Sequence, residues 1–205
     1  MPKQSSPLST LQSYLPDGSY EQVVHYLQTY KVHLTVTRDR KSILGNYHNK
    51  LYDKTHRISV NGNLNEYSFL ITLLHELAHM MAFDKFGQRI PPHGQEWKTE
   101  FGKILSEFIP QKLFPPEIEK ILLDTLKSPG ASTCADAHLT RALRKYDLQV
   151  EGLVLVEDLA EGSIFRIKGG RIFKKGIKVR TRYKCTEIRT TRVYLFSGVH
   201  EVMKG

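Results

Sequence analysis

The stretch HELAH, residues 75–79, places two histidines and a glutamate at positions that suit metal-assisted hydrolysis. On a helix, His75 and His79 would share one face about 6 Å apart along the axis. Their imidazole nitrogens could then converge on one metal ion at about 2.0–2.1 Å. Glu76 lies between them and could hold a metal-bound water and accept its proton. The spacing therefore predicts two metal ligands and a general base.

The motif alone is a weak signal, because a chain of this composition contains it by chance with a probability of roughly 0.02–0.03. The alternative is an amphipathic helix whose histidines are hydrogen-bonded in the core or exposed at the surface. The neighbouring apolar residues, among them Leu73, Leu74 and Leu77, would bury the polar groups. Such burial is costly without a partner. A metal ion is the partner that would offset this cost.

A catalytic zinc site needs a third protein ligand and one open position for water. His93, which follows a pair of prolines at 91–92, is one candidate for the third ligand. Glu96 and Glu100 are competing candidates that a following helix would supply. The longer pattern HExxHxxGxxH is absent. The third ligand therefore has to come from beyond the helix that carries the motif.

A helix packed on a sheet would position these side chains, and the sequence predicts both elements. A capping pair at Asn63 and Glu66 and a stop at Gly87 predict a long helix from about 64 to 86. Alternating apolar residues predict a three-stranded sheet in which Ile58 and Val60 face one way, with strands over 32–37, 41–47 and 56–61.

The remainder of the first 150 residues is predicted to be helical and to end in a linker. Periodicity predicts further helices over 19–30, 95–108, 116–127 and 138–147. Trp97 is predicted to pack the second of these against the helix that carries HELAH. The stretch 128–137 is rich in small residues and is predicted to be a linker.

From about residue 151 the pattern changes to short strands and turns, and positive charge concentrates there. The range 166–192 holds eleven Lys or Arg residues against a single acid, Glu187. In IKVRTRYKC the basic residues alternate, so in one strand they would share a face: Lys178, Arg180, Arg182 and Lys184. Such a stripe predicts a surface that binds nucleic-acid phosphates. The alternative is a solvated face that protects a sheet edge from aggregation.

Length and composition suit one domain with a core, alone or with a small appendage: 205 residues, 25% charged, with a net charge of +9. The charge favours polyanionic partners. No run approaches the roughly eighteen apolar residues of a membrane span, and the N-terminus lacks the apolar region of an export signal. We therefore expect no membrane partner and a cytoplasmic location. Cys134 and Cys185 are too few for a disulfide framework.

The stretch NEYSFLITLLHELAHMMAF followed by HGQEWK resembles the Spartan-related, SprT-like zinc metalloprotease family. The upstream SILGNY and HRISVN are similar to strands that precede the active helix in this family, so the resemblance covers about residues 8–127. It implies one zinc ion held by His75, His79 and His93, with Glu76 as the general base of peptide-bond hydrolysis. It also implies protein substrates that are associated with DNA or crosslinked to it.

The C-terminal region departs from that family, many of whose members end in a zinc ribbon with four cysteines. RYKC resembles the position of the first cysteine, but Ile188 stands where the partner of Cys185 would be, and no later cysteine follows. A second zinc site is therefore not expected. A small all-β module, SH3-like barrel in type, is predicted instead.

We predict an α+β fold with a zincin-type metalloprotease domain over 1–130, a linker with a short helix over 131–150, and a basic β-rich module over 151–205. The predicted function is a zinc-dependent endopeptidase that cleaves DNA-associated or DNA-crosslinked proteins. Two alternatives stay open at this point. One is a zinc-containing nucleic-acid-binding protein without protease activity, and the other is a general protein or peptide hydrolase whose basic module binds an acidic partner.

Overall fold

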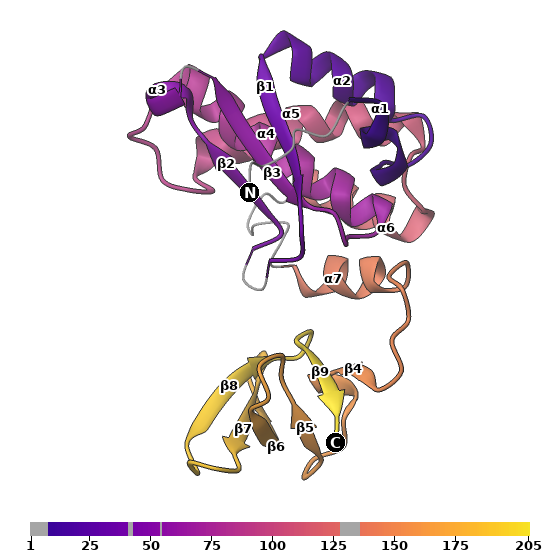
Figure 1. Cartoon of the computed structure of the whole chain (residues 1–205), viewed down its shortest axis with the longest axis vertical. Coiled ribbons are helices and arrows are strands. Elements are labelled where there is room, and N and C mark those ends of the chain that lie inside the picture. Colours follow the sequence, from indigo (N-terminus) through magenta and orange to yellow (C-terminus); the bar gives the residue numbers. More distant parts are fainter. Residues whose placement is uncertain (1–7, 41–42, 54, 128–135) are drawn as a thin grey trace. The chain divides into compact units, whose positions relative to one another are not determined.

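A computed structural model describes residues 8–40, 43–53, 55–127 and 136–205 of the chain. The chain divides into two compact units, Met1–Asp147 and Leu148–Gly205. The first unit combines helices with a three-stranded sheet, and the second is built on a six-stranded sheet (Figure 1). The predicted α+β class with a C-terminal all-β part is confirmed.

The helices of the first unit are α1 (Leu8–Leu11), α2 (Tyr20–Thr29), α3 (Lys50–Asp53), α4 (Glu66–Phe86), α5 (Gln95–Phe108), α6 (Pro116–Lys127) and α7 (Ala137–Arg144). Short 3-10 turns follow α1 and α5: η1 (Gln12–Tyr14) and η2 (Ile109–Gln111). The strands of the first unit are β1 (Val32–Thr37), β2 (Gly45–His48) and β3 (His56–Asn61). The second unit contains β4 (Leu153–Leu155), η4 (Val156–Asp158), β5 (Ile164–Arg166), β6 (Ile172–Val179), β7 (Arg182–Glu187), β8 (Val193–Ser197) and β9 (Glu201–Lys204).

The sheet of the first unit has the order β1-β3-β2. The central strand β3 pairs in parallel with β1 and antiparallel with β2, which is an edge strand. Ile58 and Val60 are buried on the same face, as predicted, because alternate residues of a strand point to the same side. α4 packs on β2 and β3, and it lies behind the sheet in Figure 1. The edge strand therefore runs beside the helix that carries HELAH.

α4 is buried around most of its circumference, in keeping with its nearly continuous apolar sequence. Its N-cap is Asn65, whose side-chain oxygen accepts the backbone N–H of Ser68. The predicted capping pair of Asn63 and Glu66 is therefore wrong. A tertiary contact explains why Asn65 rather than Asn63 is the N-cap, since the side-chain amide of Asn65 also donates to the carbonyl of Leu143. Gly87 ends the helix with a φ of 73°, as predicted.

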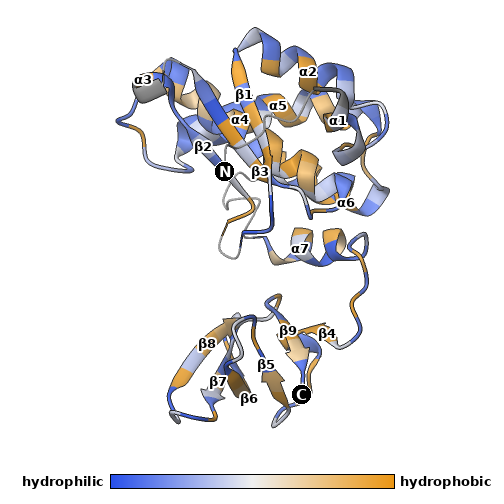
Figure 2. Cartoon of the chain, in the orientation of Figure 1, coloured by the Kyte–Doolittle hydropathy of each residue, from blue (hydrophilic) through white to orange (hydrophobic). Residues whose placement is uncertain are grey.

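The other helices complete one core around α4. α2 buries a stripe of Val23, Tyr26 and Leu27 and turns its polar residues outward (Figure 2). α5 packs along α4, and α7 adds Leu139 and Ala142 to the same core. The segment around α7, expected within a linker, is thus part of the first unit. Among the described residues, none of the helices combines the length and the hydropathy that a membrane crossing requires.

The second unit has the strand order β4-β9-β5-β6-β7-β8, with antiparallel pairing throughout. Along β8 one face carries the buried Phe196 and the partly buried Tyr194, whereas Val193 and Leu195 on the other face are exposed. Its core consists of Val156, Leu159, Phe165, Phe173, Cys185, Phe196 and Val202. Cys185 is therefore a buried core residue, whereas Cys134 lies outside the described residues.

The prediction that four basic residues share one face of one strand is wrong. β6 ends at Val179 and β7 begins at Arg182, and the two strands pair as a hairpin. Arg180 lies in the turn with a φ of 54°. Val179 and Arg182 are direct partners and therefore point to the same side, so the two-residue turn reverses the alternation of side chains between the strands. The basic residues occupy alternate positions straight through the turn, so their spacing alone cannot distinguish a hairpin from one longer strand.

The hairpin also separates the basic side chains by face. Lys178 pairs directly with Tyr183, and directly opposed residues point to the same side of a sheet. Arg182 and Lys184 alternate with Tyr183 and therefore point to the other side. Arg182 and Lys184 remain neighbours on one exposed face. A bulge between Lys175 and Lys178 further changes the register along β6.

Candidate metal centre

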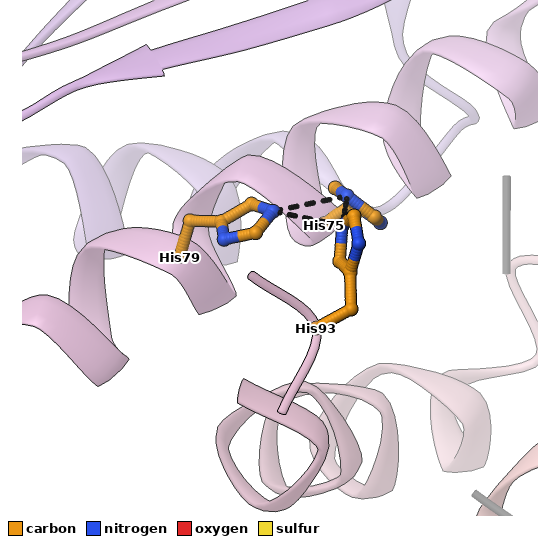
Figure 3. Close-up of side chains that lie close together, drawn as sticks. All are labelled: His75, His79 and His93. Atoms are coloured by element: carbon orange, nitrogen blue, oxygen red, sulfur yellow. Dashed lines mark hydrogen bonds between the residues drawn. The ribbon is translucent and has the colours of Figure 1, made fainter. Parts of the chain in front are cut away.

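The three predicted ligands come from two elements of the first unit. His75 and His79 lie one turn apart on α4, and His93 lies in the loop that leads into α5. The backbone of His93 is left-handed, with a φ of 57°, an uncommon conformation for a residue with a side chain. Gly94 follows as the N-cap of α5. This turn directs the imidazole of His93 back toward α4 (Figure 3).

The three imidazoles meet through their Nε2 atoms (Figure 3). These atoms are 3.2 Å apart between His75 and His79, 3.1 Å between His79 and His93, and 3.0 Å between His93 and His75. In a tetrahedral zinc site with zinc–nitrogen distances of about 2.0–2.1 Å, ligand nitrogens lie about 3.3–3.4 Å apart. The triangle of nitrogens therefore has the size that a zinc ion requires.

The chemistry of the three nitrogens also favours a bound metal ion. A hydrogen bond between two imidazoles needs one protonated and one unprotonated nitrogen. Three Nε2 atoms in mutual contact cannot all satisfy one another, whereas a cation in front of them can accept a lone pair from each. Imidazole donors suit zinc among the common divalent ions. The residues present therefore fit a zinc ion.

The surroundings keep the histidines in the neutral form that binds metal. Burial lowers the pKa of His75 to about 3, and the neighbouring His79 and His93 lower it further in the same direction. Burial, with a contribution from His93, lowers the pKa of His79 to about 4. Burial also lowers the pKa of His93. All three are therefore unprotonated near neutral pH, as a ligand must be.

Glu76 is buried on the side of α4 that faces the edge strand β2. Burial raises the pKa of its carboxyl to about 7, while the charge of Arg40 and a hydrogen bond from the backbone N–H of Tyr47 act in the opposite direction. A carboxyl with such a pKa can accept and return a proton near neutral pH. It has the protonation behaviour expected of a general base.

The ring of Trp97, on α5, packs against the imidazoles of His75 and His93. The predicted packing of α5 against α4 is therefore confirmed. The centroid of the Trp97 ring lies 4.6 Å from that of His75 and 4.7 Å from that of His93. Its indole N–H donates to the backbone carbonyl of His75, and Phe101 stacks behind it at 4.8 Å. These contacts restrict the orientation of the imidazoles.

The competing glutamates are engaged elsewhere or lie outside the cluster. Glu100 is buried, and its two carboxylate oxygens accept hydrogen bonds from Lys85 and Lys103. Glu96 is not part of the cluster. Within the described parts of the chain, the group of potential metal ligands around the motif consists of the three histidines. A fourth coordination position is therefore left for water or substrate.

Sequence reasoning missed the residues on β2 that contact Glu76. A Cβ atom at Gly45 would lie 2.7 Å from Oε1 of Glu76, and Tyr47 supplies the backbone hydrogen bond. No local signal marks these residues, because their contact with Glu76 depends on how the sheet packs on α4. The predicted nucleic-acid-binding residues Lys178, Arg180, Arg182 and Lys184 all belong to the second unit.

Two comparisons with known proteins gave matches. Residues 18–117 match the model of the SprT-like family. The chain is 30% identical over 83 residues to Protein SprT of Pseudomonas fluorescens (strain Pf0-1). That alignment covers 40% of the chain and 48% of the relative, so it spans about half the relative's length. No solved structure gives a significant match. The segment 18–117, which carries the histidine cluster and Glu76, belongs to the SprT-like family.

Proposed function

We propose that this protein is a zinc-dependent endopeptidase of the zincin type, in which His75, His79 and His93 hold one zinc ion. The observation that carries the proposal is the convergence of three neutral imidazoles beside a buried glutamate. Structural zinc sites are closed by four protein ligands, whereas catalytic sites keep one position open. Three protein ligands therefore favour catalysis over a structural role.

The reaction requires a base at the position of Glu76. When bound, zinc would polarise the scissile carbonyl and lower the pKa of water in the open position toward about 7. The carboxylate of Glu76 accepts a proton from the attacking water and delivers it to the leaving amine. Its burial keeps bulk water from competing for the same proton.

The edge strand β2 supports an extended peptide as substrate. The backbone N–H of Asn61 donates to the carbonyl of Leu44. Because hydrogen-bonded and non-bonded pairs alternate in an antiparallel ladder, the N–H and C=O groups of Gly45 and Tyr47 point away from β3. The N–H of Tyr47 is used by Glu76, whereas the N–H and C=O of Gly45 and the C=O of Tyr47 can pair with an added strand. A substrate bound in this way would run beside Glu76.

We propose further that the substrates are proteins associated with DNA or crosslinked to it. The resemblance to Spartan-related proteins supports this substrate class, and so does the excess of Lys and Arg in the range 166–192. Arg182 and Lys184 are exposed neighbours on one face of β7 and are the first candidates for phosphate contacts. We also propose that the second unit is a small barrel of the SH3-like type.

The decisive experiment follows cleavage of a basic, DNA-bound protein by the zinc-loaded chain, with and without single-stranded DNA. Glu76→Gln is the matched control, because glutamine keeps the shape of the side chain but cannot accept the proton. Cleavage that needs DNA and disappears in Glu76→Gln supports both parts of the proposal.

The other outcomes separate those parts. Equal cleavage rates with and without DNA would remove the link to DNA and keep the peptidase. Absence of cleavage, with zinc binding confirmed by metal analysis, would contradict the peptidase and favour a zinc-containing nucleic-acid-binding protein. Equal activity in Glu76→Gln and the wild type would contradict the assignment of the base.

A further inference from the structure

Glu76 occupies a space that exists because residue 45 has no side chain. An added Cβ at Gly45 would lie 2.7 Å from Oε1 of Glu76 and 2.7 Å from Cγ2 of Thr72. Contacts this short require a neighbouring side chain to move. The φ angle of Gly45 is not positive, so its backbone is accessible to other residues. Space rather than backbone conformation therefore requires glycine at this position.

The neighbouring residue on the same side of β2 holds the carboxylate. Tyr47 does not use its backbone N–H in the ladder with β3, because that group points to the free edge. This N–H donates to the carboxylate of Glu76. Gly45 thus provides room for the carboxylate, and Tyr47 provides a directional hydrogen bond to it.

Both ends of β2 are anchored to the rest of the first unit. At the far end, the hydroxyl of Tyr47 is 2.8 Å from Nδ1 of the buried His56 on β3, and the two rings stack with centroids 5.7 Å apart. The second nitrogen of His56, Nε2, lies 3.2 Å from a carboxylate oxygen of Asp84 on α4. The phenol of Tyr47 thus contacts His56 of the sheet, and the His56 ring in turn lies beside Asp84 of the active helix.

Arg40 anchors the other end. Its guanidinium donates to Oδ1 of Asn61 at 2.7 Å and to Oγ of Ser59 at 2.9 Å, both on β3. It also donates to the carbonyl of Leu44, the residue that precedes β2. A guanidinium with several acceptors in fixed directions holds the chain more firmly than a single bond would. The position of Gly45 over Glu76 is therefore fixed from both sides.

We propose that β2 is a clamp for the catalytic glutamate, in which Gly45 and Tyr47 position the Glu76 carboxylate and Arg40 and His56 hold the strand in place. This inference rests on the proposed peptidase function and extends it to positioning residues outside the HELAH motif. In this arrangement a small displacement of β2 moves the base relative to the attacking water. Such displacements lower turnover while leaving metal binding intact.

The first test is Gly45→Ala, with Gly102→Ala as the matched control. Gly102 is on α5, and an added Cβ there would make an ordinary contact of 3.6 Å with Leu126. In Gly45→Ala we expect kcat to fall on the order of ten- to a hundred-fold. Zinc affinity, measured by competition with a chelator, should stay within about two-fold of the wild type. Gly102→Ala should keep the kcat of the wild type.

The second test observes the clamp without reference to activity. The scalar coupling across the hydrogen bond between the Tyr47 amide nitrogen and the Glu76 carboxylate carbon can be measured by NMR on the full chain. We expect it in the wild type and in Gly102→Ala, and we expect its loss in Gly45→Ala and Glu76→Ala. Tyr47→Phe keeps the ring but removes the hydroxyl, so it should weaken the coupling and lower kcat by about two- to ten-fold.

The outcomes distinguish this inference from the proposed function. An active wild type, together with a Gly45→Ala variant that keeps its kcat and its Tyr47 coupling, overturns the clamp and leaves the peptidase standing. A zinc-loaded wild type that cleaves no protein substrate but shows the Glu76-dependent coupling overturns the peptidase while the contact itself stands. A fall in kcat with equal loss of zinc affinity shows that Gly45 supports the metal site as a whole, and it also overturns the clamp.

Discussion

Helix α4 and the turn end of the β6–β7 hairpin differ in how far they expose their polar side chains. α4 buries His75 and Glu76 among apolar residues, at 5% and 7% exposure. The hairpin leaves Arg182 and Lys184 exposed to water. A buried polar group needs a partner to offset desolvation, so the arrangement on α4 demands a chemical explanation. Exposed lysine and arginine cost little, so their positions alone do not define a site.

The largest expected effect is the loss of zinc affinity when one histidine ligand is removed. It would test whether the buried polar side chains of α4 form a metal site. His79→Ala leaves two imidazoles at the centre. We expect zinc affinity to fall by more than the 10- to 100-fold that is typical for loss of a residue that merely orients a ligand. Competition with a chromogenic chelator measures it. The control is His25→Ala, because His25 is exposed on α2; an equal loss in both variants would contradict the site.

Truncation of one large buried ring in each unit should sharpen the contrast between them. Trp97→Ala and Phe173→Ala each remove a fully buried aromatic side chain, which typically costs about 3–5 kcal/mol of unfolding free energy. Only Trp97 contacts the histidines, so only Trp97→Ala should also lower zinc affinity. Denaturant unfolding and chelator competition on the same samples measure both quantities. Reduced zinc affinity in Phe173→Ala would contradict the assignment of the site to the first unit.

Charge reversal on the hairpin would test whether its exposed side chains have a function. The double variant Arg182→Glu, Lys184→Glu alters two neighbours on one face, so we expect weaker DNA binding. The slope of log affinity against log salt concentration should also fall by the amount that about two phosphate contacts contribute. Lys31→Glu with Lys120→Glu makes the same change in net charge on the first unit and serves as the control. Fluorescence anisotropy over a range of salt concentrations measures both. Equal weakening in the two variants would indicate a general charge effect.

The same comparison explains how much of the candidate site could be predicted. His75, Glu76 and His79 lie within one helical turn, so their relative positions follow from local geometry that a sequence displays directly. His93 depends on a left-handed backbone conformation. Its position after the Pro-Pro loop made it a candidate, and the resemblance to the SprT-like family favoured it over Glu96 and Glu100. Gly45 and Tyr47 could not be predicted, because their contact with Glu76 arises from the packing of β2 on α4.

The fold shows the same division between local and tertiary information. Strand and helix types in the first unit followed from periodicity, including the burial of Ile58 and Val60. The hairpin was missed because its turn contains Arg180 and Thr181 rather than the Asn-Gly or Asp-Gly that signals a tight turn. Asn65 rather than Asn63 caps α4 because it also bonds to Leu143, a contact that the sequence does not reveal.

The smallest expected effect is on the pH dependence of stability, where a buried histidine and a buried carboxylate act in different ranges. Burial lowers the pKa of His56, against the opposing charge of Asp84. Below the unfolded-state value of about 6.5 the unfolded chain binds a proton that the folded chain excludes. The stability contributed by neutral His56 is therefore complete above that pH and is lost as the pH falls. The difference in unfolding free energy between the wild type and His56→Gln should shrink from pH 7 to 5.5, both with saturating zinc.

Glu187 in the second unit stabilises the fold in its charged form, whereas His56 does so in its neutral form. A hydrogen bond from Arg171, with another from Thr190, lowers the pKa of Glu187 to about 2. Its stabilising contribution is present above the unfolded-state value of about 4.3 and is lost as the pH falls toward 2. The difference between the wild type and Glu187→Gln should therefore stay constant from pH 7 to 5.5, the range in which the His56→Gln difference changes. Coincident pH profiles for the two variants would show that one shared process, rather than two separate buried groups, controls acid unfolding.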